Sequence, residues 1–150
     1  MSSPSDSLAS PATTNETLDD VLTLLGRLLM AYLFIVEGYG KIGGYASVQG
    51  YMAQAGVPSV LLPLVILAEL GGGVAIVLGL FTRPIAIALA AFCVLTALIF
   101  HHGASEAIGL QKDLCIAGGF LILASRGGGA WALDRWLCVI APGLAGRYWR

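Results

Sequence analysis

The stretch VLLPLVILAELGGGVAIVLGLFTRPIAIALAAFCVLTALIF, residues 60–100, decides the fold class. It consists of two apolar runs, Val60–Leu80 and Pro84–Phe100, whose single charged side chain is Glu69. Each run approaches the length of about 20 apolar residues that a helix needs to cross a bilayer. Because only the three residues FTR separate them, the runs must form a tight antiparallel helical hairpin, and a proline suits the first position of its second helix.

Two further apolar runs complete a set of four. Leu18–Tyr39 is interrupted by Arg27 and Glu37, and Leu110–Ser125 carries a charged pair near its start. All four runs are continuous and lack the alternation of apolar and polar residues that strands of a membrane β-barrel need. The sequence therefore predicts an all-α membrane protein, a bundle of four transmembrane helices.

The composition agrees with a chain whose main partner is the lipid bilayer. The 150 residues are 57% hydrophobic and 11% charged, whereas soluble domains carry about 25% charged residues. The formal net charge of −1 leaves no basic patch for nucleic acid, so we expect no nucleic-acid partner. The three cysteines lie far apart without a C-x-x-C motif, which predicts neither a disulfide framework nor a zinc site.

The chain divides into three parts. Residues 1–17 are rich in Ser, Thr, Pro and acidic residues and are expected to form a flexible tail. They lack the basic region and apolar run of a secretory signal. Thr17, with Asp20 three residues later, resembles a helix-capping signal, so we expect the first helix to start there. Residues 18–125 form the membrane domain, and residues 126–150 form a cytoplasmic segment at the membrane interface.

Two short interfacial helices are predicted outside the spans. In the loop of residues 41–59, apolar residues recur at helical spacing from Val48 to Ala55, which is typical of a helix on the membrane surface. After residue 125, Arg126 and a run of glycines end the fourth helix. Trp131 and Trp136 then suit the headgroup layer, which predicts a C-terminal interfacial helix.

Basic residues predict the orientation in the membrane. Four spans place both termini on one side, together with the FTR turn. The positive-inside rule then puts that side, and both termini, in the cytoplasm. The basic residues on the side of the termini are Arg83, Arg126, Arg135, Arg147 and Arg150, and those on the opposite side are Lys41 and Lys112.

Glu69 is the most informative charge. It lies about ten residues from either end of its run, and an ionised group at that depth costs at least about 2.5–3.5 kcal/mol, so it usually faces the bundle interior and has a partner. Arg27 also lies inside a run, too far along the helix to pair with Glu37. We therefore expect an Arg27–Glu69 ion pair at the centre of the bundle.

Glu37 and Lys41 allow two interpretations. Spaced four residues apart, they can form an ion pair on one helix face at the membrane edge. Alternatively, they belong to a polar pocket inside the bundle. His101 and its neighbour His102 project about 100° apart on a helix, so no metal site is predicted there. The residues of the candidate polar pocket are Arg27, Glu37, Lys41, Glu69, His101 and Lys112, none of which can be assigned a catalytic role.

Several stretches together resemble one family. They are GRLLMAYLFIVEGYGKIGGY (residues 26–45), AGVPSVLLPLVILAELGGGVAIVLGLFTRP (55–84), the histidine that ends the third run, QKD before LCIAGGFLILA (111–124), and ALDR (132–135). In this order and spacing they are similar to the DoxX family. Two positions depart from its usual pattern, Asp113 in place of asparagine and Ala132 in place of serine.

The resemblance implies a bacterial inner-membrane protein of four helices in the DoxX/DoxD group. Relatives in this group are linked to quinone-dependent thiosulfate oxidation, oxidative-stress complexes or quinone detoxification. For this chain it implies a redox-linked subunit that binds a quinone between its helices, in which Arg27, Glu69 and Lys41 would hydrogen-bond the quinone carbonyls or carry protons. The sequence carries no nucleotide motif, haem attachment signature or cysteine pair, so electrons would come from an oxidoreductase partner.

Two other functions remain open at this point. The chain could be a non-enzymatic scaffold that anchors a soluble oxidoreductase through its tail, the FTR turn and its C-terminal segment. A small-solute carrier is less favoured, because four short spans show no inverted repeat. Small residues at four-residue spacing, such as Gly71, Ala75 and Gly79, allow close helix packing within the bundle or a homo-oligomer.

Overall fold

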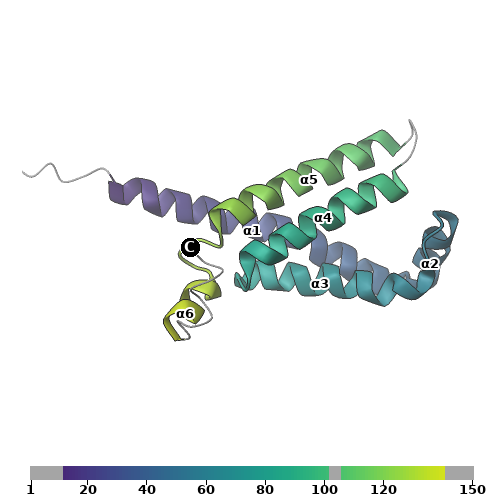
Figure 1. Ribbon diagram of the computed structural model, residues 1–150, viewed down its shortest axis with the longest axis horizontal. Coiled ribbons are helices and arrows are strands. Elements are labelled where there is room, and N and C mark those ends of the chain that lie inside the picture. The colour runs from purple at the N-terminus through teal and green to yellow at the C-terminus, as the bar shows by residue number, and fades with distance from the viewer. Residues whose placement is uncertain (1–11, 102–105, 141–150) are drawn as a thin grey trace, which may run out of the picture.

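The computed structural model describes residues 12–101 and 106–140, and within these ranges the regular structure is entirely helical. Four segments are long and apolar enough to cross a membrane: residues 15–43, 59–78, 82–100 and 107–126. The predicted all-α bundle with additional short helices is therefore confirmed. The elements in Figure 1 are α1 (Ala12–Gly43), α2 (Tyr45–Gln54), the 3-10 turn η1 (Ser59–Leu61), α3 (Leu62–Leu78), α4 (Thr82–Phe100), α5 (Ala107–Arg126) and α6 (Leu133–Ile140).

The first helix is longer at both ends than the sequence predicted. It begins at Ala12 rather than near Thr17, and it continues to Gly43. Residues 12–17 contain neither glycine nor proline, so nothing in them interrupts a helix that already runs downstream. The remainder of the predicted tail, residues 1–11, and the basic residues Arg147 and Arg150 lie outside the described residues.

The four long helices form two pairs. α1 packs chiefly on α3, and α4 packs chiefly on α5, whereas contacts between the pairs are fewer. Figure 1 shows the two pairs diverging toward the end of the molecule where α2 lies.

Glycines bring α1 and α3 together. A Cβ atom added at Gly38 would lie 2.8 Å from Leu70 Cγ, and one added at Gly73 would lie 2.9 Å from Ile35 Cγ1. Only glycine lets the two backbones approach this closely. By contrast, a Cβ at Gly71 would meet only Leu67 of its own helix, at 3.8 Å, so Gly71 makes no close helix contact in the described structure.

Aromatic residues fill the core where the pairs meet. The rings of Phe34 and Phe120 pack edge to face with centroids 5.2 Å apart, and Phe92 lies 6.2 Å from Phe34. Many large apolar side chains lie instead on the outer surface, among them Leu29 and Val60, which are 73% and 79% exposed. Exposed apolar surface on this scale marks contact with lipid.

The end of the molecule opposite α2 is closed by the segment that leads into α6. Asp134 accepts hydrogen bonds from the backbone N–H groups of Phe81 (2.6 Å) and Thr82 (2.8 Å), so it caps the start of α4. Its own N–H donates to the carbonyl of Gly79 at 2.9 Å. Gly79 has φ = 69°, a left-handed conformation typical of the residue that ends a helix, here α3. The ALDR motif therefore fastens the chain to the α3–α4 turn.

The predicted helix in the first loop is present as α2, which lies across one end of the bundle in Figure 1. Met52 is buried beneath it. Tyr51 stacks on Phe100 of α4, with centroids 5.2 Å apart and an angle of 18° between the ring planes. This contact connects α2 to the pair formed by α4 and α5.

Candidate functional site

A cavity of about 960 Å³ lies between the two helix pairs at the α2 end. Most of its wall is apolar, with Phe34 on α1, Val65 on α3, Phe92 on α4 and Ile116 on α5, while Tyr51 contributes from α2. The volume falls within the range of small-molecule sites, which are mostly apolar with a few placed polar groups. The cavity has two such polar groups, one on each helix pair.

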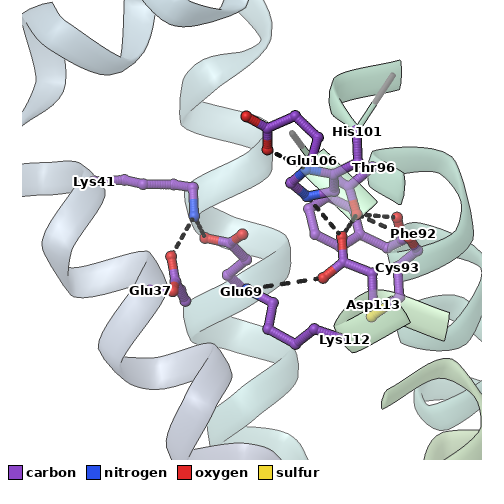
Figure 2. Close-up of polar contacts among 10 residues, drawn as sticks. All are labelled: Glu37, Lys41, Glu69, Phe92, Cys93, Thr96, His101, Glu106, Lys112 and Asp113. Atoms are coloured by element: carbon purple, nitrogen blue, oxygen red, sulfur yellow. Dashed lines mark hydrogen bonds and ion pairs between the residues drawn. The ribbon is translucent and has the colours of Figure 1, made fainter. Parts of the chain in front are cut away.

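The first polar group joins α1 to α3. Lys41 Nζ lies 2.9 Å from Oε2 of Glu69 and 3.5 Å from Oε2 of Glu37 (Figure 2). Glu69 is only 6% exposed, whereas the Glu37 side chain is half exposed. The contact with Glu69 is a direct ion pair but is not aligned as a hydrogen bond, so Glu69 Oε2 has no hydrogen-bond partner among the described residues. Lys41 therefore contacts Glu37 on its own helix and the buried Glu69 on α3. It takes part both in an ion pair on one helix face and in a polar group that lines the cavity.

The second polar group joins α4 to α5. His101 Nε2 lies 3.4 Å from Oδ2 of Asp113, and His101 Nδ1 lies 3.2 Å from Oε2 of Glu106 (Figure 2). The hydroxyl of Thr96 is 3.3 Å from the same Asp113 oxygen. Lys112 Nζ lies 3.9 Å from Oδ1 of Asp113 and is half exposed, so this ion pair is weak. His101 thus bridges an outer and an inner carboxylate.

The predicted Arg27–Glu69 ion pair is wrong. Arg27 is 1% exposed, and its guanidinium donates to three backbone carbonyls: Nε to Ile76 (3.0 Å), Nη2 to Val77 (2.6 Å) and Nη1 to Gly128 (2.7 Å). Ile76 and Val77 lie at the end of α3, where carbonyls lack partners within the helix and a cation is favourable. Arg27 therefore stabilises the end of a helix.

Helix register explains the error. α1 and α3 run antiparallel, and Gly38 packs against Glu69 while Arg27 reaches Ile76. Ile76 is seven residues beyond Glu69, roughly 10 Å along the helix. Lys41, one turn beyond Gly38, consequently takes the place beside Glu69 that the sequence had assigned to Arg27.

Five of the six sequence-predicted pocket residues line the cavity. Arg27 is the exception. Sequence reasoning also missed Asp113, Thr96 and Cys93, which line the cavity on the α4–α5 side. An acid inside the fourth apolar run was a signal for Asp113, because such a group is expected to face the bundle interior. The five predicted residues that the structure brings together are Glu37, Lys41, Glu69, His101 and Lys112.

Comparisons with known proteins agree with this architecture. The DoxX family model matches residues 22–102, a range that includes Lys41, Glu69 and His101. Inner membrane protein YqjF of Escherichia coli (strain K12) is 50% identical over 123 residues, which cover 80% of this chain and 95% of that protein. Inner membrane protein YphA of the same organism is 38% identical over 125 residues, covering 77% and 89%. No solved structure matches. The chain therefore belongs to the DoxX family and is an integral membrane protein with inner-membrane relatives.

Proposed function

We propose that the protein is a redox-linked membrane subunit whose cavity binds the headgroup of a quinone. One observation carries this proposal: the Lys41–Glu69 pair on α1 and α3 and the His101–Asp113 pair on α4 and α5 line the same apolar cavity. Each side of the cavity therefore offers a nitrogen that can donate a hydrogen bond and a carboxylate that can accept one.

This arrangement suits both oxidation states of a quinone. The oxidised ring has two carbonyl oxygens at opposite ends, and each needs a donor, which Lys41 and His101 supply. After reduction the two hydroxyl groups become donors, for which the carboxylates of Glu69 and Asp113 are acceptors. The faces of the ring are apolar and match the wall that includes Phe34 and Phe92. In this proposal the two electrons come from a partner oxidoreductase, which is oxidised, and the two protons of the hydroxyl groups come from the surrounding water.

We infer further that the protein lies in the bacterial inner membrane with both termini in the cytoplasm. The names of the two relatives support the membrane, and the positive-inside rule supports the orientation. Arg83 and Arg126 lie at the α6 end of the bundle, whereas Lys41 and Lys112 lie at the cavity end. The cavity then opens in the half of the bilayer away from the cytoplasm.

Quinone extraction tests the proposal. The chain is purified from bacterial membranes in lipid nanodiscs, and its lipids are extracted and assayed for quinone. We expect quinone in an amount comparable to the protein and well above that in empty nanodiscs. Glu69→Gln should lower the quinone content, because the neutral amide no longer holds the Lys41 ammonium in the cavity. Glu16→Gln is the matched control, since Glu16 is exposed near the start of α1.

Two outcomes would contradict the quinone proposal. Wild-type protein with no more quinone than empty nanodiscs would show that the cavity does not bind a quinone. An unchanged quinone content in Glu69→Gln would remove the role proposed for the Lys41–Glu69 pair. Size-exclusion chromatography of each variant separates loss of binding from loss of folding.

A scaffold function is the second candidate, because Trp131 and Trp136 remain exposed near α6. Deleting residues 131–150 would not test it cleanly, since the deletion removes Asp134, which caps α4. The double substitution Arg135→Ser, Trp136→Ser changes exposed side chains only. If the scaffold function holds, these changes abolish capture of an oxidoreductase and leave the quinone content unchanged.

A further inference from the structure

We propose that a second, wholly apolar groove between α3 and α4 holds the hydrocarbon tail of the ligand whose headgroup occupies the cavity. This inference rests on the proposed quinone binding and deepens it. It names the ligand class as a long-tailed quinone of the membrane, and it distinguishes that class from short, water-soluble quinones. It also defines the route by which the ligand reaches the cavity, sideways from the bilayer.

The groove has a volume of about 450 Å³ and is lined entirely by glycine and apolar side chains. Small residues keep it open: Gly71 on α3, and Ala88 and Ala91 on α4. Gly71, Ala88 and Ala91 are exposed on the outer surface. A Cβ at Gly71 would meet only Leu67, at 3.8 Å, so the groove above Gly71 is unfilled by the described residues.

The groove adjoins the cavity. Ala68, Phe92 and Leu95 line both of them. Ala68 presents a single methyl group on the α3 side and directly precedes Glu69, the buried acid of the first polar group. Leu95 is exposed, so its side chain can change rotamer without disturbing the core. The wall that the two spaces share is therefore a single methyl group on the α3 side, and on the α4 side it includes an exposed leucine side chain.

The two spaces follow each other along the helices in the order that a tailed quinone requires. The cavity uses residues 61–69 of η1 and α3 and residues 92–101 of α4. The groove uses residues 68–72 and 85–95, which lie at the middle of the two spans. A headgroup in the cavity would thus sit toward the α2 end, while its tail would extend toward the bilayer centre.

Energetics decide which measurement is informative. Lipid chains are as apolar as leucine, so moving a hydrocarbon tail from the bilayer into the groove yields little hydrophobic free energy. The polar groups of the cavity supply the specific contacts, and the groove fixes where the tail lies. The test must therefore report the position of the tail and not only the affinity.

Photolabelling reports that position. The full chain is placed in nanodiscs of phosphatidylethanolamine and phosphatidylglycerol with a ubiquinone analogue that carries a diazirine on its isoprenoid tail. After illumination, peptide mapping locates the label. We expect it within residues 68–95 of α3 and α4. A second analogue, with the diazirine next to the ring and no tail, should label residues that line the cavity.

Matched variants sharpen the test. Gly71→Leu places a large side chain in the groove from α3, where a Cβ would meet only Leu67 at 3.8 Å, and Ala88→Leu places one there from α4. Both should lose the tail label between residues 68 and 95 and keep the tail-less ring label in the cavity. Gly118→Leu on α5 is the control, because a Cβ there meets nothing within 4 Å and Gly118 lines neither space. It should keep both labels.

Three outcomes contradict the inference, and they differ from one another. Tail label spread over all four spans, with the ring label still in the cavity, overturns the groove and leaves quinone binding intact. No ring label above that of a diazirine phospholipid overturns quinone binding and the groove together. Tail label absent from the groove, together with a change of oligomeric state in Gly71→Leu, assigns the groove to a second copy of the chain.

Discussion

The ammonium of Lys41 lies 2.9 Å from Oε2 of Glu69 and is shared with Glu37 at 3.5 Å. This contact lies beside a close approach of α1 and α3, where Gly38 packs against Glu69. Glu69 is buried and Glu37 is half exposed. The same lysine therefore contacts one carboxylate inside the bundle and a second carboxylate at its edge. The two acids should therefore respond differently to loss of the lysine.

Removing the lysine should destabilise the protein through Glu69. Lys41→Met leaves a buried carboxylate without its cation, and loss of one partner from a buried ion pair costs about 3–5 kcal/mol. Because Lys41 is itself partly exposed, we expect a smaller loss, about 2–3 kcal/mol. Thermal unfolding of the purified protein measures it. Glu37→Gln should change the free energy of unfolding by less than about 1 kcal/mol, as for other exposed pairs.

A double substitution separates the ion pair from its parts. Lys41→Met combined with Glu69→Leu removes both charges and should recover much of the lost stability, because an apolar pair replaces a buried ionic one at little cost. A double variant as unstable as the sum of the single variants would mean that the two residues do not interact.

Arg27 should tolerate no replacement. Its three donors satisfy the carbonyls of Ile76, Val77 and Gly128, and Lys cannot reproduce this fork. We expect both Arg27→Lys and Arg27→Met to lower the free energy of unfolding by on the order of 3 kcal/mol or more. Arg126→Lys is the control, since Arg126 is exposed and 3.9 Å from Asp19. If Arg27→Lys melts like the wild type, the fork is unimportant.

Substitutions of Asp134, which caps the start of α4, should lower the free energy of unfolding by graded amounts. Asp134 accepts from two backbone N–H groups, so Asp134→Ala should cost about 0.5–2 kcal/mol, as for other helix caps. Asp134→Asn keeps one acceptor oxygen and should cost less. The order wild type, Asn, Ala in apparent melting temperature checks the prediction, and equal melting temperatures would refute the cap.

Substitutions of Lys112 and Asp113, neighbours near the start of α5, should differ in their effect on quinone content. Asp113 is buried and contacts His101 and Thr96, whereas Lys112 is half exposed. If the proposed function holds, Asp113→Asn lowers the quinone retained on purification, because His101 loses the inner of its two carboxylate partners. Lys112→Met should leave that content near the wild-type value. The reverse order would transfer the role to Lys112.

Accessibility of single cysteines tests the orientation. In a background with Cys93, Cys115 and Cys138 replaced by alanine, Ser47→Cys on α2 and Glu16→Cys on α1 introduce exposed thiols at the two ends of the bundle. With both termini in the cytoplasm, a membrane-impermeant maleimide added to spheroplasts should label Ser47→Cys alone. Glu16→Cys should react only after lysis. Labelling of Glu16→Cys in intact spheroplasts would show the opposite topology, with both termini outside the cytoplasm.

Much of the architecture was predictable because it depends on run length and hydropathy. The hairpin of α3 and α4, the short helices and five of the six pocket residues follow from where polar residues interrupt apolar runs. Arg27 was misassigned because a buried cation was expected to need an acid, whereas the carbonyls at the end of α3 satisfy it. The choice between Arg27 and Lys41 depends on helix register, which Gly38 and Gly73 set through contacts between distant residues.

Asp134 illustrates what no local pattern could reveal. Its partners are the N–H groups of Phe81 and Thr82, more than 50 residues earlier in the chain. The sequence predicted only an interfacial segment around ALDR, because side chain-to-backbone contacts over this separation leave no trace in composition or periodicity. Ala132 packs against Gly79 in the same junction, where a small side chain is needed.

The junction between the α6 segment and the α3–α4 turn has a consequence for biogenesis. Arg27 belongs to the first span made, yet one of its acceptors is Gly128; α4 is third, yet its cap is Asp134. During synthesis, all four spans must therefore emerge before either helix end is complete. The nascent bundle lacks these contacts until residues 128–134 have left the ribosome, so a stretch translated after all four spans completes contacts of the first span and of the third.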